Sequence, residues 1–332
     1  MAKQLPKFLA NVYVNIRESN DQLQREFLEC LKNREIISKF SYWGEEPTQA
    51  WLRFCRAAEY KTYPQGVSLL RKVSADIADR VGASRVNYIS LGVGNGEKDA
   101  ILLQWLYKTS RLIRYYPIDI STDMIKAGLN HVFAHFRNLP TTAFVTDFKI
   151  LDEIAQAETF RRDRNFFSLL GNTMGNFNQV SLLNILRHSL DRNDYLLVGV
   201  STRRERSQET KADVNRIIRS YSNKASKEFA YSPLKKAGIK KSDGVVDVEF
   251  NRDPLYPRLN RVDLFFCFRK NKTAHYCGQE IVYRKGERIL LYFSEKYYPD
   301  DLTFLFQDNG FRIVKFYQNT EQSYAKILCR LK

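Results

Sequence analysis

The chain has 332 residues, 44% of them hydrophobic, and its 53 Lys and Arg outnumber 37 Asp and Glu to give a formal charge of +16. This is ample apolar material for one large globular unit or two of ordinary size, and no apolar run approaches the roughly 20 residues that a membrane-spanning helix needs. Five cysteines without paired metal-ligand spacing argue against a metal centre and a disulfide scaffold, and because no signal segment follows the first residues we expect a cytoplasmic protein.

The first 66 residues are predicted to be mostly helical and become rich in aromatic side chains. From Val67 to about residue 200 the pattern alternates between helices and apolar strands, which is typical of an α/β fold with a parallel sheet. Ligands of such sheets bind at the carboxyl ends of the strands. The loops that follow the strands are therefore the first places to look for a site.

A glycine-rich loop follows the first predicted strand, over 88–91. Gly92, Gly94 and Gly96 let the backbone turn tightly and approach a ligand, and Glu97 opens an amphipathic helix. A glutamate at this helix start would repel a pyrophosphate. A lone glycine pattern is weak evidence, because an ordinary strand-to-helix turn explains it equally well.

Acidic residues end the next two predicted strands. The strand over 112–119 ends in Asp119, where a carboxylate can bind ribose hydroxyls, and the strand over 143–146 is followed by Asp147 and Phe148. An acid beside an aromatic ring suits an adenine better than a phosphate. Together with the glycine-rich loop, these features favour S-adenosylmethionine over a dinucleotide.

Two more strands, over 165–170 and 195–200, complete this half of the chain. The loop 171–177 between them has two glycines and two asparagines, and its place at the carboxyl end of a strand makes it a candidate site. Residues 201–241 hold twelve Lys or Arg against four acids, a net charge of +8. We interpret this region as a solvated face, because aromatic residues do not interleave regularly with the charges as nucleic-acid binding requires.

The remaining chain first changes character and then returns to the earlier pattern. Strand-like runs over 262–268 and 289–293 predict a second unit, and a helix near 300–307 precedes paired strands over 311–317 and 323–331. An antiparallel pair at the edge of a parallel sheet suits a methyltransferase better than a dehydrogenase.

Five motifs together resemble the histidine-specific, S-adenosylmethionine-dependent Nα-methyltransferases of the ergothioneine pathway and their relatives. The motifs are Leu-Gly-Val-Gly at 91–94 with Glu-Lys-Asp at 97–99, Tyr-Pro-Ile-Asp-Ile-Ser at 116–121, Asp-Phe at 147–148, Leu-Gly-Asn-Thr-Met-Gly-Asn at 170–176, and Gly-Glu at 286–287 with Ser-Glu-Lys-Tyr at 294–297. The resemblance implies a Rossmann-like methyltransferase domain, with helices on both faces of its sheet, over 67–200 and 296–332. It also implies a second, α+β substrate-binding domain built from 1–66 and 201–295.

The resemblance assigns cofactor contacts to residues of the first three motifs. It implies that Gly92 and Lys98 contact S-adenosylmethionine. It also implies that Asp119 holds the ribose and that Asp147 and Phe148 flank the adenine.

On the acceptor side, Asn176 matches an asparagine that holds the α-amino or carboxylate group of the amino acid, and Tyr221 matches a tyrosine beside the carboxylate. Both are candidate catalytic residues, because methyl transfer to nitrogen mainly requires an amine lone pair held near the methyl carbon. A tyrosine or a water could take the amine proton beforehand. Tyr63 matches a tyrosine that closes the site, with Tyr60 as a rival, and Ser294 begins the last motif.

One stretch departs from the family pattern. Tyr292 stands two residues before Ser294, where the histidine enzymes have a glutamate that meets the imidazole, and Leu264 stands where methionine is usual. Because a neutral phenol cannot supply the charge of a glutamate, we expect the acceptor to be another amino acid or amino-acid-like amine. Histidine stays an alternative, and so does a non-catalytic RNA- or protein-binding module on a degenerate fold, although the retained Gly92 and Asp119 argue against loss of the cofactor.

Overall fold

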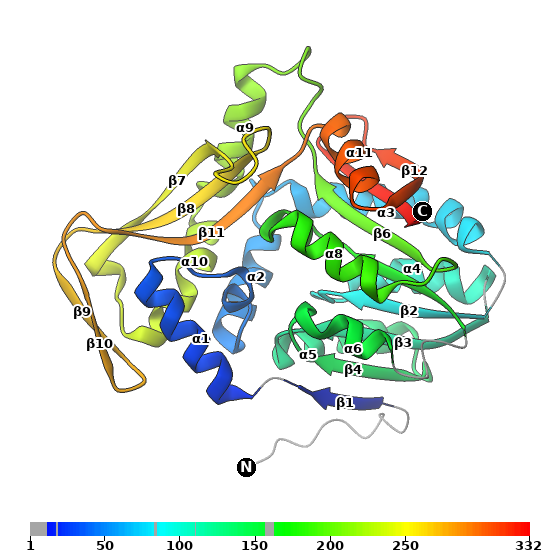
Figure 1. Ribbon diagram of the computed structural model, residues 1–332, viewed down its shortest axis with the longest axis horizontal. Coiled ribbons are helices and arrows are strands. Elements are labelled where there is room, and N and C mark those ends of the chain that lie inside the picture. Colours follow the sequence, from blue (N-terminus) through cyan, green and yellow to red (C-terminus); the bar gives the residue numbers. More distant parts are fainter. Residues whose placement is uncertain (1–11, 18, 83–84, 110, 157–162) are drawn as a thin grey trace.

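The computed structural model describes residues 12–17, 19–82, 85–109, 111–156 and 163–332 (Figure 1). Its larger unit is built on an eight-stranded sheet with the strand order β1-β4-β3-β2-β5-β6-β13-β12. The strands are β1 (Val12–Ile16), β2 (Arg85–Leu91), β3 (Arg111–Asp119), β4 (Thr141–Val145), β5 (Arg164–Leu169), β6 (Tyr195–Ser201), β12 (Phe311–Gln318) and β13 (Tyr324–Leu331). The first six run parallel, and β13 and β12 add an antiparallel edge.

Helices cover both faces of this sheet (Figure 1). One face packs against α6 (Leu151–Ala155), α8 (Gln179–Ser189) and α11 (Pro299–Asp308). The other packs against α3 (Thr62–Val81), α4 (Glu97–Thr109) and α5 (Thr122–His135). Strands β2, β5 and β6 are buried along nearly their whole length, as parallel strands between two helical layers must be. The predicted α/β methyltransferase fold with helices on both faces is confirmed.

Strand β1 lies in a range that is predicted to be mostly helical. It pairs in parallel with β4, from Val12 opposite Thr141 to Ile16 opposite Val145. It therefore belongs to the large sheet, although the range 1–66 is predicted to belong to the second unit; residues 1–11 lie outside the described residues. Its side chains are mostly exposed, but its sequence Val-Tyr-Val-Asn-Ile is rich in β-branched and aromatic residues, a strand signal that the helical prediction overlooked.

The second unit contains a three-stranded antiparallel sheet, a hairpin and a helical layer (Figure 1). The sheet has the order β11-β8-β7, with β7 (Gly244–Arg252), β8 (Asn260–Phe268) and β11 (Arg288–Lys296), and the hairpin joins β9 (Lys272–Tyr276) to β10 (Gln279–Tyr283). The helices are α1 (Asn20–Asn33), α2 (Glu45–Cys55), α9 (Lys211–Tyr221) and α10 (Lys224–Tyr231). Strand β11 leaves this unit toward the larger one, where Tyr297 forms a parallel bridge with Thr202.

Short 3-10 helices connect these elements and carry several loop residues. They are η1 (Ser38–Ser41), η2 (Phe148–Ile150), η3 (Thr173–Asn176), η4 (Ser232–Ala237) and η5 (Lys241–Asp243). Among the residues that the structure describes, no helix is both long and apolar enough to cross a membrane.

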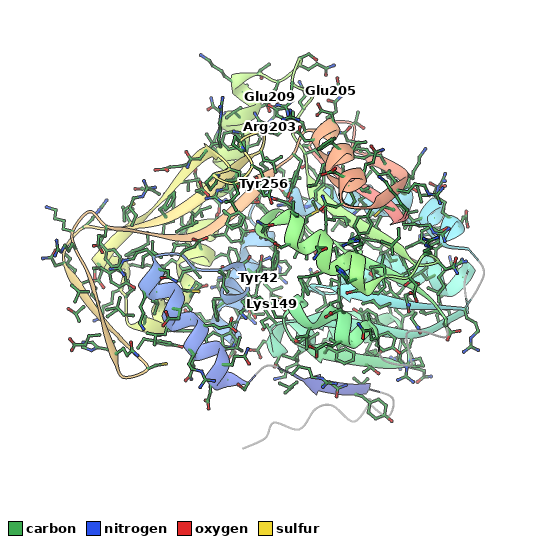
Figure 2. The ribbon with its side chains drawn as sticks, in the orientation of Figure 1. Tyr42, Lys149, Arg203, Glu205, Glu209 and Tyr256 are labelled. Carbon is green, nitrogen blue, oxygen red and sulfur yellow. The ribbon has the colours of Figure 1, made fainter. Side chains whose placement is uncertain are left out.

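The basic region 201–241 folds into α9, α10 and the segments around them. Of its twelve Lys and Arg, eight are exposed, in line with a solvated face. Arg203 is an exception: it is buried, donates to Glu209 over 2.7 Å, and stacks on Tyr298. Figure 2 shows Arg203 and Glu209 together where the two units meet. The charge of Arg203 therefore stabilises the contact with Glu209 and Tyr298 and is not part of the solvated face.

Candidate active site

A cavity lies at the carboxyl ends of β2, β3, β4 and β5. Its lining includes six of the seven predicted cofactor residues: Gly92, Gly94, Lys98, Asp119, Asp147 and Phe148. About 800 Å³ of space lies between these residues, a value that includes space open to solvent. Gly96 lies outside this lining, because it packs against α5, where a Cβ atom would be 2.4 Å from the carbonyl oxygen of Gly128.

The glycine-rich loop is shaped for close approach. Gly92 and Gly94 have φ values of +72° and +58°, in the left-handed region that favours glycine. A Cβ atom on Gly94 would lie 2.9 Å from the indole ring of Trp51 on α2. The second unit therefore packs directly on this loop and forms one wall of the cavity.

Asp119 ends β3 inside the cavity. The carboxylate accepts a hydrogen bond from the backbone N–H of Ser121 over 3.1 Å, and Ser121 in turn caps α5, as the sequence predicts. Burial raises the pKa of Asp119 to about 7, although neighbouring backbone N–H groups oppose the rise. The group is thus a buried hydrogen-bond acceptor whose charge changes near neutral pH.

Asp147 is held by Lys39, a residue that no sequence motif singles out. The Lys39 ammonium lies 3.0 Å from Asp147 and 2.6 Å from Glu26 of α1. Burial opposes the charge, but the two carboxylates raise the pKa of Lys39 above its usual value. Lys39 therefore connects the second unit to the predicted adenine residue, whose neighbour Phe148 packs against Phe177 with ring centroids 5.7 Å apart.

Tyr63 lies on the cofactor side of the site. Its hydroxyl hydrogen is shared between Asn95 Oδ1 at 2.8 Å and Glu97 Oε2 at 2.7 Å, and its ring lies 4.4 Å from the Lys98 ammonium. Burial lowers the pKa of Lys98. Tyr63, near the start of α3, therefore packs against the glycine-rich loop and is not bonded to Asn176.

Asn176 sits on η3 between two tyrosines. Its Nδ2 donates to the Tyr42 hydroxyl over 3.3 Å, and its Oδ1 accepts from the Tyr292 hydroxyl over 2.8 Å. Tyr42 also lines the cofactor cavity. The amide retains one N–H and one lone pair for a ligand, because Asn offers two donors and two acceptor positions.

A second polar group surrounds Tyr221. Its hydroxyl lies 3.0 Å from Ser294 Oγ, which also accepts from Asn172 Nδ2 over 2.9 Å. Lys296 donates to both hydroxyl oxygens, over 3.1 Å to Tyr221 and 2.6 Å to Ser294. Each of these side chains is buried.

Aromatic rings join the two polar groups. Phe229 contacts Tyr42 and Tyr292 with ring centroids 5.6 and 5.4 Å away. Phe54 stacks on Phe229 and also contacts Tyr221. The rings that complete this cluster belong to Tyr60, which lies 5.7 Å from Tyr221, and Trp51, which lies 6.4 Å from Tyr42. Tyr60 is thus nearer to the predicted acceptor residues than Tyr63 is.

A β-bulge orients the acceptor residues of β11. Leu290 pairs with Phe265 and Tyr292 pairs with Leu264, so Leu291 is the extra residue. Beyond it, Tyr292 is bonded to Asn176 and Ser294 to Tyr221. Phe293 and Glu295, on the other face of the strand, line a second cavity. Leu264 is fully buried beside Tyr292, where the sequence places a substrate contact.

The second cavity, of about 1,440 Å³ including open space, adjoins the first. The two share Lys39, Asp147, Phe148 and Phe177 as a common wall. Figure 2 labels two further lining residues, Tyr256 and Lys149, at the boundary between the units. Asn176 belongs to its lining as well, so the loop 171–177 borders this cavity on one side.

Sequence reasoning missed Lys39, Tyr42, Trp51 and Lys296. Aromatic residues such as Tyr42 and Trp51 are more often core than ligand contacts, and nothing in their spacing separates the two roles. Lys296 was quoted only as part of a motif. Within the described ranges, no cluster of three or more His, Cys, Asp or Glu is arranged to hold a metal ion.

Comparisons with known proteins identify the family and several relatives. A family described as histidine-specific, SAM-dependent methyltransferases matches residues 23–331. The N-methyltransferase imqF of Aspergillus flavus is 22% identical, over 93% of this chain and 85% of its own. The histidine N-alpha-methyltransferase of Mycolicibacterium smegmatis is 23% identical, over 77% and 78%. The 4-dimethylallyltryptophan N-methyltransferase easF of Claviceps purpurea is 25% identical, over 53% and 54%.

Proposed function

Because the chain belongs to the family of histidine-specific, SAM-dependent methyltransferases, we propose that it methylates the amine of an amino acid or amino-acid-like molecule other than histidine. The observation that carries the choice of acceptor is Tyr292. Its hydroxyl is bonded to Asn176, and burial raises its pKa well above the usual value for tyrosine. A neutral phenol is therefore present where a histidine enzyme needs a carboxylate.

The residues of the first cavity fit S-adenosylmethionine. Gly92 leaves room for a ligand against its backbone, and Asp119 offers a buried acceptor to ribose hydroxyls. Asp147 and Phe148 would flank the adenine, one as a hydrogen-bond acceptor and the other as an apolar face. Lys98, near the sheet end of the cavity, would lie toward the amino-acid part of the cofactor.

Asn176 is suited to hold the acceptor amine. S-adenosylmethionine, when bound, would supply the electrophilic methyl group that the acceptor nitrogen takes up. Asn176 has a free lone pair that can accept an amine N–H and so direct the nitrogen lone pair. Such positioning accounts for much of the catalysis of a displacement between two bound reactants.

The second cavity, which Asn176 borders, offers space for the side chain of the acceptor. Its walls are mainly apolar, with Ile37, Leu182, Ile185, Leu255 and Phe293 among them. The named relatives include a histidine enzyme and an enzyme for a prenylated tryptophan, so the family accepts amino acids of different bulk. This cavity supports an acceptor side chain larger and more apolar than imidazole.

Incubation with methyl-labelled S-adenosylmethionine and a panel of L-amino acids tests the proposal. We expect label on the amine of aromatic or apolar members, measured by mass spectrometry, and little on histidine. Efficient methylation of histidine alone would refute the choice of acceptor. An absence of methylation on every amine, by a protein that binds the cofactor, would refute the proposed reaction.

A further inference from the structure

Lys296 is a buried ammonium that has no carboxylate partner among the described residues. Only 3% of the residue is exposed. Its three N–H groups are shared among four neutral oxygens: Ser294 Oγ at 2.6 Å, Tyr221 Oη and Glu295 O at 3.1 Å, and Ser294 O at 3.2 Å. No carboxylate in the described part of the chain forms an ion pair with it. A buried charge is costly unless it is paired, so this position is prepared for an anion.

The neighbouring acid does not supply that anion. Glu295 follows the alternation of the strand, and its side chain faces the second cavity, with Asp253 and Arg261 nearby. Burial first, and then Asp253, raises the pKa of Glu295 to about 9. Glu295 is therefore protonated at neutral pH and leaves the charge of Lys296 uncompensated.

The hydrogen-bond directions follow from counting donors. Ser294 Oγ accepts from Lys296 and from Asn172, which uses both of its lone pairs, so its own hydrogen is donated to Tyr221. The Tyr221 oxygen then accepts from Ser294 and from Lys296. Its hydrogen has no acceptor among these neighbours. Tyr221 is therefore a donor, and it cannot take a proton from the amine.

We propose that Lys296 is a positioning residue that determines specificity: its charge fixes Tyr221 as a donor and makes the site select acceptors with a carboxylate. The inference rests on the proposed function and narrows the acceptor to a free amino acid. Tyr221 and Asn176 are linked through the aromatic cluster, and we expect one molecule to present its carboxylate to the first and its amine to the second. The amine proton must then leave through a water.

Matched ligand pairs test this proposal without requiring turnover. The complex with S-adenosylhomocysteine is titrated calorimetrically with L-tryptophan against tryptamine and with L-histidine against histamine. In the parent we expect each acid to bind more tightly than its amine, by about ten- to a hundredfold for a charge-assisted contact. Lys296→Met should abolish this preference and leave the amine affinities within about twofold. Lys296→Arg should retain part of it.

Tyr221→Phe is a second variant, which keeps the charge and removes the donor, and it should also weaken the acids selectively. Lys315→Met on the exposed side of β12 is the control and should change nothing. Equal losses for acids and amines would show that Lys296 only supports the fold and would overturn the proposal. A parent that binds both members of each pair alike, or no acid at all, would do the same. Selective acid binding without methylation would instead refute the proposed function and uphold Lys296.

Discussion

Asp119 should make cofactor binding depend on pH near neutrality. Burial raises its pKa from 3.8 to about 7, so in the free protein the carboxyl is mostly protonated at pH 6 and mostly ionised at pH 8. Ribose hydroxyls donate more strongly to a carboxylate than to a carboxylic acid. Binding below pH 7 must therefore release a proton from Asp119.

The size of the effect follows from linkage. Affinity for S-adenosylmethionine should be constant above about pH 8 and fall by about tenfold for each pH unit below 7. The sign for stability is opposite. The pKa of Asp119 in the folded protein lies above its unfolded value of 3.8, so between these two pH values the folded protein binds more protons than the unfolded chain. The free energy of unfolding therefore falls as the pH rises through this window.

Calorimetry in two buffers with different ionisation enthalpies measures the proton release. Asp119→Asn should flatten the pH dependence, and Asp119→Ala should weaken binding about ten- to a hundredfold at pH 8. Asp99 is the main competitor, because burial also raises its pKa, to about 6, and it lines the same cavity. If Asp119→Asn keeps the full pH dependence of the parent, Asp99 is the titrating group and the reasoning about Asp119 is wrong.

Three further outcomes follow from the site and the surface. Asn176→Ala should lower turnover by about 10²-fold with unchanged affinity for S-adenosylhomocysteine, because the amine loses its positioning contact; a parallel loss of cofactor affinity would contradict this. Tyr292→Glu should move the acceptor preference toward histidine in competition assays, since a carboxylate can pair with an imidazole, and an unaltered preference would remove the argument from Tyr292. The basic region 201–241 should show no sequence-selective RNA binding at 200 mM salt, which filter binding against scrambled RNA can check.

Local signals predicted the large sheet well. Strands β2 to β6 were found within a few residues of their ends, because a strand buried on both faces is a continuous apolar run bounded by turn residues. Their parallel direction followed from the alternation with helices, whereas their order in the sheet was not predicted. Gly92, Asp119 and Asp147 could be proposed as cofactor residues because they lie at or just after the carboxyl ends of strands.

Contacts between distant segments could not be predicted. Strand β1 pairs with residues more than a hundred positions away, and Lys39 reaches Asp147 over a similar separation. Neither segment indicates its distant partner, although the residues of β1 favour a strand. The hairpin of β9 and β10 turns at Cys277 and Gly278, both with positive φ. Cys is not among the residues that predict such a turn. The sequence could not decide between Tyr63 and Tyr60, because the spacing around Tyr63 differs from that of the family motif.

The bulge at Leu291 makes acceptor choice depend on the register of β11 and not only on its composition. A substitution at Tyr292 or Ser294 changes one contact and leaves the others in place. If Leu291 instead of Tyr292 paired with Leu264, the two faces of the strand would be exchanged at every later position. Phe293 and Glu295 would then face the side of Asn176 and Tyr221, and Lys296 would turn toward the neighbouring cavity. A single shift of pairing at this point would therefore replace a whole recognition surface in one step.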